Sequence, residues 1–228
     1  GGSGTDTFTV SSGVNPTITV TGGSGAQELA QTDGINSWSV SGSGDGTVDN
    51  VTFTNIGALT GGSGADTLTT SGVGPFDWAI DSATTGTVEG ISFSNMNTLV
   101  GGGGSDNFTV NSGVDPTLVL DGGLGTNSLS KTDGTNSWSI TGSGAGTVGN
   151  ITFSSMQTIT GGSGTDTFTV PSGVNPTITV TGGSGAQELA QTDGTNSWSI
   201  TDSGAGTVGN VTFTNIDTLT GGSGTDTF

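Results

Sequence analysis

The chain has 228 residues, of which 28% are hydrophobic and 46 are glycine, and its formal net charge is -18 because it contains one basic residue. A single basic residue excludes proteins that bind nucleic acid or anionic membrane surfaces, since both need clusters of Lys and Arg. The absence of Cys and His excludes disulfides and thiolate or imidazole metal sites. No apolar run approaches the roughly 20 residues that cross a bilayer, so membrane insertion is not expected.

The chain is built from repeats. Residues 1–60 return as residues 161–220 with few changes, and residues 1–34 differ from residues 161–194 only in having Ser11 where the later copy has Pro171. Residues 101–160 form a more divergent copy, residues 61–100 form a shorter one, and residues 221–228 begin another. The shorter copy is expected to lack one coil. Such a loss is tolerable in a solenoid, because each coil contacts only its neighbours. The repeats therefore predict one continuous solenoid over residues 1–228.

Glycine-rich segments divide these units further. Wherever no segment is missing, their spacing is about 20 residues, a period typical of repeat architectures. They open at Gly1, Gly22, Gly42, Gly61, Gly101, Gly122, Gly142, Gly161, Gly182 and Gly221. We interpret each segment as a corner at which the chain turns, because glycine adopts the positive φ of tight turns without strain. The spacing then predicts coils of about 20 residues.

Between the corners, apolar residues alternate with Thr and Ser. This period of two, with many β-branched and aromatic residues, is typical of strands, and no helical stripe occurs. The residues expected to point inward are Phe8, Val10, Ile18, Val20, Leu29, Trp38, Val40, Phe53, Ile56 and Leu59. Equivalent aromatic residues recur in every unit and are expected to fill the core, namely Trp38, Trp78, Trp138, Trp198, Phe53, Phe93, Phe153 and Phe213. The pattern predicts an all-β fold, a single elongated parallel β-solenoid of the β-roll or β-helix kind.

The corner sequence GGSGTDTFT has the form G-G-x-G-x-D-x-U-x, with Gly1, Gly2, Gly4, Asp6 and Phe8 at its defining positions. It resembles the nonapeptide of the RTX (repeats-in-toxin) family, within what looks like the long repeat region of a giant bacterial surface adhesin or fibre protein. The resemblance implies right-handed winding. It also implies Ca²⁺ held between loops of consecutive coils, with the carboxylates of Asp6, Asp66, Asp106, Asp166 and Asp226 as ligands.

The order of the corners argues against this metal site. Gln27 follows Asp6, Asn127 follows Asp106 and Gln187 follows Asp166 at the corresponding positions, so consecutive corners do not both carry Asp. Strands are about 4.8 Å apart, so two Asp-bearing corners with another corner between them are too far apart to bind one Ca²⁺, whose oxygen ligands lie at about 2.3–2.6 Å. We expect a neutral ladder of amides that separates the carboxylates, with Asp and Asn bonded to their own backbone and no cofactor required.

Three functions are compatible with these features. The first is a structural repeat module of a secreted or cell-surface fibre or adhesin, acting as a rod or filament-forming segment. The second is a calcium-binding module of the RTX type. The third is a flat surface that binds ice or glycan through outward Thr pairs such as Thr7/Thr9, Thr17/Thr19 and Thr52/Thr54. We expect no enzyme activity, since Lys131 stands where sister units have Gln31 and Gln191 and therefore looks like surface drift.

The expected location is extracellular, at a bacterial cell surface. Because the first residue is Gly1 rather than Met, we expect a mature product or a segment of something longer. The stretch GGSGTDTF occurs at residues 1–8 and again at residues 221–228, at the same phase of the repeat. The expected partner is therefore another copy stacked head to tail, or the continuation of a longer chain, with a glycan or host surface as the adhesive target.

Overall fold

A computed structural model describes residues 1–228, which form strands, turns and loops without a helix. The unit of residues 1–60 contains β1 (Asp6–Val10), β2 (Ile18–Thr21), β3 (Gln27–Gln31), β4 (Ser37–Gly42), β5 (Asp45–Val48), β6 (Val51–Thr54) and β7 (Ala58–Thr60). The short unit of residues 61–100 contains β8 (Thr67–Thr70), β9 (Asp77–Ile80), β10 (Gly86–Val88), β11 (Ile91–Ser94) and β12 (Thr98–Val100).

The later units repeat the pattern of the first. Residues 101–160 contain β13 (Asn107–Val110), β14 (Val119–Asp121), β15 (Ser128–Lys131), β16 (Asn136–Gly142), β17 (Ala145–Val148), β18 (Ile151–Ser154) and β19 (Thr158–Thr160). Residues 161–220 contain β20 (Ser163–Val170), β21 (Ile178–Thr181), β22 (Ser184–Gln191), β23 (Asn196–Asp202), β24 (Ala205–Val208), β25 (Val211–Thr214) and β26 (Thr218–Thr220). The last strand is β27 (Asp226–Thr227). No segment forms a helix of the length and apolarity that a membrane crossing needs.

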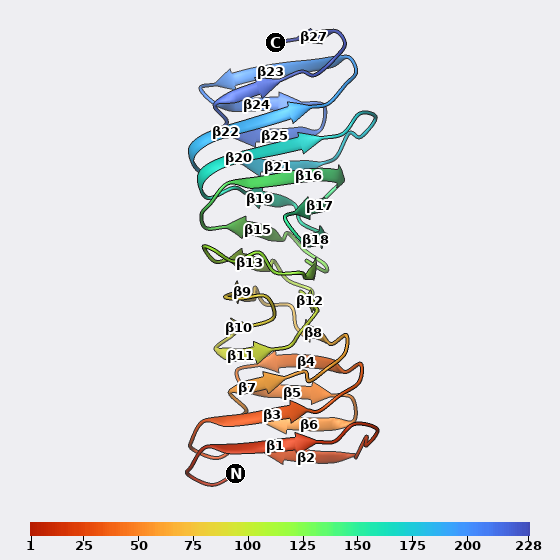
Figure 1. The fold of residues 1–228 in the computed structure, drawn as a ribbon, viewed down its shortest axis with the longest axis vertical. Helices are drawn as coiled ribbons and strands as arrows, with labels where there is room; N and C mark the ends of the chain where they lie inside the picture. The colour runs from red at the N-terminus through yellow and green to blue at the C-terminus, as the bar shows by residue number, and fades with distance from the viewer.

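The strands make two sheets that run along the molecule, with the two termini at opposite ends of the stack (Figure 1). One sheet has 14 strands in the order β1-β3-β7-β11-β10-β9-β13-β15-β19-β21-β25-β24-β23-β27. The other has 13 strands in the order β2-β6-β5-β4-β8-β12-β14-β18-β17-β16-β20-β22-β26. The chain passes back and forth between the sheets, and most neighbouring strands are parallel. The predicted all-β class is confirmed, and the arrangement is that of a β-solenoid-like fold.

Each unit contains one antiparallel insert, so the expectation of purely parallel strands is wrong there. In the first unit β5 pairs antiparallel with both β4 and β6. The same three-strand arrangement recurs in β9–β11, β16–β18 and β23–β25. The glycine-rich segment at Gly42 is therefore the turn between β4 and β5 rather than a solenoid corner. Gly44 in this turn has a φ of 85°, a left-handed conformation that favours glycine.

The inserts also lengthen the coils. Where no insert intervenes, a coil runs from Phe8 to its parallel partner Leu29 in the next coil. Where an insert intervenes, the parallel partners are further apart in sequence, as Leu29 and Leu59 are, and likewise Leu59 and Phe93. The predicted coil of about 20 residues, a period taken from the glycine spacing, therefore describes only the coils without an insert. The spacing was misleading because it counted the hairpin turns as corners.

A glycine in the middle strand of each insert makes room for an aromatic ring. A Cβ added at Gly46 would lie 2.6 Å from Cζ of Phe53 and 2.0 Å from the carbonyl oxygen of Ser39. The same approach occurs between Gly146 and Phe153. Glycine inside a strand often marks such a close approach. The ring can then pack against the tryptophan of the same insert, as Phe53 does against Trp38 with centroids 6.5 Å apart.

The core is one cluster of 41 buried hydrophobic residues that continues through all units. Of the ten residues expected to point inward, eight are buried, and the four tryptophans are at most 4% exposed. The two exceptions lie in the terminal coil: Ile18 is 49% exposed and Phe8 is half-buried. Their counterparts Ile178 and Phe168 are buried, because those residues have a coil on each side. The inward assignment is thus confirmed except where stacking stops.

Successive units present their equivalent strands on opposite sheets. Each unit passes between the sheets an odd number of times, so β1 lies in the 14-stranded sheet and its near-identical counterpart β20 lies in the 13-stranded sheet. The short unit lacks the counterparts of β2 and β3, one strand from each sheet. Its missing residues therefore correspond to one full turn, and their loss leaves the alternation of the faces intact.

Candidate functional site

The predicted aspartates belong to a polar ladder along the corners. The backbone N–H of Asn36 donates to Oδ1 of Asp66 at 2.8 Å, and the Nδ2 group of Asn36 donates to the same oxygen at 2.6 Å. The N–H of Asp66 in turn donates to Oδ1 of Asn97 at 2.9 Å. Each of these side-chain oxygens thus accepts a bond from the backbone of the preceding coil. The ladder therefore links successive coils through side-chain hydrogen bonds, in addition to the backbone hydrogen bonds between strands.

The same arrangement recurs elsewhere in the stack. The N–H of Phe76 donates to Oδ1 of Asp106 at 2.9 Å, the N–H of Asp106 donates to Oδ1 of Asn127 at 2.8 Å, and the N–H of Asn127 donates to Oε1 of Gln157 at 2.6 Å. The N–H of Asn136 donates to Oδ1 of Asp166 at 3.1 Å. Amide residues therefore separate the carboxylates, as the sequence predicts. The expectation that these corners bond to their own backbone holds for Asp6, which accepts from the N–H of Gly2, and for Asn127 and Asn136, whose Nδ2 groups donate to the carbonyl oxygens of Leu124 and Gly134. In the interior ladder, Oδ1 of each aspartate accepts instead from the preceding coil.

Three of these carboxylates are fully buried. Asp66, Asp106 and Asp166 are 0% exposed, and Oδ2 of each has no hydrogen-bond partner. Burial raises the pKa of all three carboxyl groups above the ordinary value, against the opposing effect of the bonds to Oδ1. The first glycine of each corner accommodates the free oxygen, since a Cβ at Gly101 would lie 2.4 Å from Oδ2 of Asp106.

The ladder does not fit a calcium site of the RTX kind. Ca²⁺ takes 6–8 oxygen ligands, whereas each interior corner supplies one carboxylate. The Nδ2 donor of Asn36 points at Asp66, and that of Asn136 points at Asp166, where a cation would have to lie. No three carboxylates gather anywhere in residues 1–228. The five predicted ligands are thus distributed along the stack, one to a corner, with Asp6 and Asp226 half-buried near its two ends.

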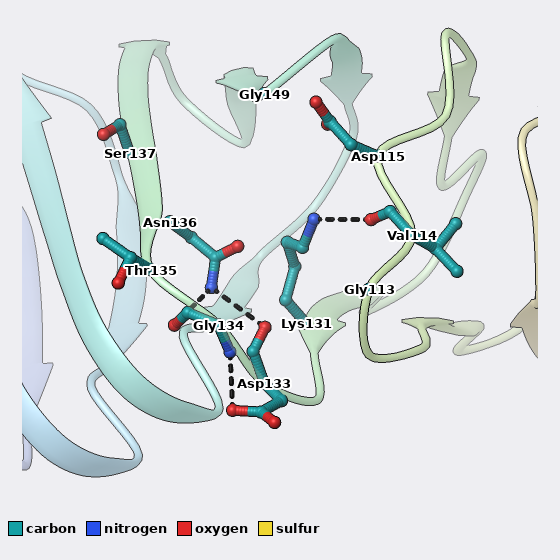
Figure 2. Close-up of a pocket in the computed structure, with 10 residues that line it drawn as sticks. All are labelled: Gly113, Val114, Asp115, Lys131, Asp133, Gly134, Thr135, Asn136, Ser137 and Gly149. Carbon is teal, nitrogen blue, oxygen red and sulfur yellow. Dashed lines mark hydrogen bonds between the residues drawn. The ribbon is translucent and has the colours of Figure 1, made fainter.

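A hollow of about 360 Å³ contains the only lysine of the chain (Figure 2). It is lined by Gly113, Val114, Asp115, Lys131, Asp133, Gly134, Thr135, Asn136, Ser137 and Gly149. Nζ of Lys131 donates to the carbonyl oxygen of Val114 at 3.0 Å, and the residue is 7% exposed. The interpretation of Lys131 as surface drift is therefore wrong. Its position two residues after the inward Leu129 is the signal that predicts burial.

Sister hollows occur at the same place in the first and last long units. They are lined by Gln31 and Asp33 in one and by Gln191 and Asp193 in the other. Gln31 is 5% exposed and Gln191 is 7% exposed, so the inward slot is polar in all three long units. Around Asp133, the hydroxyl of Ser163 and the N–H of Gly134 lower the pKa of the carboxyl group. The hollows are thus variants of one structural feature, repeated once per long unit.

Comparison with models of protein families, with curated proteins and with solved structures gives no match to this chain.

Proposed function

We propose that residues 1–228 form a structural rod, a repeat module of a secreted or cell-surface fibre or adhesin of bacterial type. The observation that carries this proposal is the repetition of the polar features along the chain. The ladder, the hollows and the aromatic pairs all recur, and no cluster of chemically active side chains stands apart from them. Residues that recur in this way maintain the stacking of the coils, so the rod provides length and separation rather than chemistry.

The geometry of the sheets supports a rod. Fourteen strands at about 4.8 Å would extend about 60 Å along the stack. One continuous core joins all units, which favours a single solenoid. We propose that its winding is right-handed, as in the RTX rolls that the corner sequence resembles. The acidic side chains would keep neighbouring rods apart, because like charges repel.

Deletion of one coil tests this function. Val110 and Lys131 are partners in adjacent coils, so removal of residues 111–131 places Val110 where Lys131 was and removes one complete turn. We expect a folded protein whose length, measured by small-angle X-ray scattering, is shorter by about 4.8 Å. The matched control is removal of residues 111–120, which takes out about half a turn and exchanges the sheets for all later strands. Unfolding of both variants, or a globular particle in the unmodified protein, would contradict the rod.

A second candidate is an ice- or glycan-binding surface. The array expected from Thr7/Thr9, Thr17/Thr19 and Thr52/Thr54 is divided between the two sheets, since β1 lies in one and β2 and β6 lie in the other. A longer array runs over the 14-stranded sheet from β13 to β25. Its residues are in register from strand to strand and none of them is charged. They are Thr109, Ser128, Ser130, Thr158, Thr160, Thr179, Thr181, Thr212 and Thr214.

This face offers hydroxyl and methyl groups at the regular spacing of the strands, a surface suited to a flat, uncharged and repeating partner. Inhibition of ice recrystallisation and binding to insoluble polysaccharides would test it. The variant Thr160→Lys places a charge in the middle of the array, and Thr52→Lys places one on the opposite sheet as its control. Equal activity of the two variants would contradict a site on the 14-stranded sheet.

A further inference from the structure

Each long unit has a hollow whose floor is polar. The floor is Lys131 in the unit of residues 101–160, and Gln31 and Gln191 in the other two long units. All three residues are at most 7% exposed. Lys131 uses one of the three donors of its ammonium group on Val114, and neither Gln amide has a hydrogen-bond partner within the protein. Because buried polar groups are normally hydrogen-bonded, these residues leave donors unused at the floor of each hollow.

The walls of the hollow are tied together by hydrogen bonds. Nζ of Lys131 lies between the loop that carries Asp115 and the segment of residues 133–136 (Figure 2). The backbone N–H and the Nδ2 group of Asn150 donate to the two carboxylate oxygens of Asp115 at 3.2 and 3.1 Å. The same backbone tie recurs in the sister hollows, from Asn50 to Asn15 at 3.2 Å and from Asn210 to Asn175 at 2.9 Å. The hollows are therefore formed before any ligand enters, as small-molecule sites usually are.

The short unit shows that stacking does not require an open hollow. The N–H of Phe76 donates to Oδ1 of Asp106 as the N–H of Asn136 donates to Oδ1 of Asp166, so Phe76 is the counterpart of Asn136. Phe76 is 8% exposed, and its ring reaches the preceding loop, since a Cβ added at Gly72 would lie 3.0 Å from its Cζ. The coils thus stack equally well with an aromatic ring at this place. The polar, open form in the long units calls for another explanation.

The groups that line the hollows define the chemistry of a ligand. The ammonium group of Lys131 and the amides of the sister floors all donate N–H bonds, so the ligand must offer acceptors there. Carboxylates line the sides, Asp115 and Asp133 here and Asp33 and Asp193 in the sister hollows, so the ligand must also offer donors. An anion would be repelled by these carboxylates, and a cation would be repelled by Lys131. Neutral hydroxyl groups both donate and accept, and they carry no charge.

We propose that each of the three hollows binds one neutral pyranose unit of a glycan. Hydroxyl groups of the sugar accept from Lys131 or its Gln counterparts and donate to Asp133 or its counterparts, while Val114 covers C–H groups of the ring. The volume of about 360 Å³ lies within the range of about 300–1,000 Å³ for small-molecule sites. The proposal rests on the proposed rod and names its adhesive partner. Because one rod carries three hollows, it binds a surface covered with glycan more tightly than any one hollow binds a single sugar.

Nuclear magnetic resonance of the isotope-labelled full chain tests this proposal hollow by hollow. The probes are the methyl pyranosides of glucose, galactose, mannose and N-acetylglucosamine, and sorbitol controls for general effects of a polyol on the solvent. The backbone amides of Gly34, Gly134 and Gly194 report on the three hollows separately, because each lines one of them. At least one pyranoside is expected to shift all three resonances, with a dissociation constant of about 1 mM for each hollow.

Substitutions at the floor test the role of its donors. Lys131→Met keeps the length of the side chain and removes the ammonium group, so binding measured at Gly134 is expected to weaken about tenfold, as the loss of one charged hydrogen bond would cause. Lys131→Gln is the matched control and should retain binding, since Gln forms the floor of the sister hollows. In both variants the affinity measured at Gly194 should stay unchanged, which also shows that the protein remains folded.

A second variant closes the hollow rather than changing its floor. Asn136→Phe introduces the residue that the short unit has at this place, where Phe76 keeps its backbone bond to the next coil. The shift at Gly134 is expected to disappear, while the shift at Gly194 remains. If Asn136→Phe lowers the melting temperature enough to unfold the protein, Lys131→Met decides alone.

The outcomes separate this proposal from the rod itself. Hollows that hold water only, so that none of the four pyranosides shifts Gly34, Gly134 or Gly194 more than sorbitol does, would overturn it. Equal affinity of Lys131→Met and the unmodified protein at Gly134 would overturn it as well. Shifts confined to the strands of the 14-stranded sheet around Thr160 would assign the sugar to the flat face instead. None of these results alters the particle length measured by X-ray scattering, so the rod stands or fails by that separate measurement.

Discussion

Residues 1–10 and 161–170 have identical sequences and different surroundings. β1 lies at an edge with one neighbour, and β20 lies between β16 and β22. Phe8 is accordingly half-buried while Phe168 is 0% exposed, and Ile18 is 49% exposed while Ile178 is 3% exposed. The same residues therefore enter the core or remain at the surface according to the coils beside them. Burial in this fold is a property of the stack rather than of a unit.

Removal of the two phenylalanine rings gives the largest expected contrast. Phe168→Ala leaves a cavity between Trp138 and the rest of the core, and such a change destabilises by about 3–5 kcal/mol. Phe8→Ala removes a half-buried ring with no tryptophan stacked on it, so its effect should be well below that of Phe168→Ala. Urea unfolding followed by tryptophan fluorescence measures both midpoints.

Equal losses of stability in these two variants would contradict the view that neighbours determine burial. The local sequence around each ring is the same, so propensity and turn chemistry cancel in the comparison. Ile18→Ala and Ile178→Ala provide a second pair with the same logic. If the stack of coils unfolds in more than one step, the quantity to compare is the midpoint of the step in which the coil of each residue unfolds.

Much of this architecture could be predicted from the sequence. The alternation of Trp38 and Val40 with serines places their side chains in the core, where both are at most 1% exposed. Gln27 and Asn127 at the corners predict the amide spacing of the ladder, which the hydrogen bonds of Asn127 confirm. Both features depend on period-two patterning and on the equivalence of the repeats, which are visible in one dimension.

Other features depend on which strand follows which. The segment at Gly42 has the composition of a corner, yet it forms a hairpin turn, because a glycine-rich stretch permits either path and pairing between β4 and β5 decides. Successive units place their equivalent strands on opposite sheets because of the number of times that the chain passes between the sheets. The sequence did not reveal this number, because hairpin turns were counted as corners. Lys131 looks like surface drift because the sister units have Gln at its position, although its register with Val110 places it inside.

Neutralisation of a buried carboxylate should give the second largest contrast. Burial raises the pKa of Asp166, so the protonated form favours the folded state. The associated stability is fully present below the unfolded pKa of about 3.9 and is lost as the pH rises through the folded pKa. Asp166→Asn is therefore expected to be more stable than the unmodified protein at pH 7, with a melting temperature higher by about 2–4 °C, and this advantage should disappear near pH 4.

The matched variant Asp6→Asn lies at the same position of an identical corner. Asp6 is half-buried and its Oδ2 accepts a bond from the N–H of Gly2, so its carboxylate loses less solvation on folding than a fully buried carboxylate does. Its melting temperature should change less at pH 7. A stabilisation of Asp6→Asn as large as that of Asp166→Asn would show that relief of the overall negative charge, rather than burial, is responsible.

Lys131→Gln makes the third long unit resemble the other two. The change removes the bond from Nζ to Val114, but Gln31 and Gln191 occupy the same buried slot in the sister units. We expect a change in unfolding free energy of less than about 1 kcal/mol, the net value of one ordinary hydrogen bond. A matched substitution Lys131→Ala leaves the slot partly empty and should destabilise more. A large loss in Lys131→Gln would give the lysine a role specific to its hollow.

Calcium removal should have the smallest effect of all, in the terminal and interior corners alike. Asn136 already supplies two donors to Oδ1 of Asp166, and Asn36 and Asn196 supply the same two donors to Asp66 and Asp226, so Oδ1 of each carboxylate has partners without a cation. Circular dichroism in excess chelator is expected to retain the β signal, and added calcium should shift the melting temperature by no more than weak surface binding does. Magnesium at the same ionic strength controls for screening of the negative charge. A β signal that collapses in chelator and returns with calcium alone would show that the fold requires calcium and that the hydrogen bonds of the ladder do not maintain it by themselves.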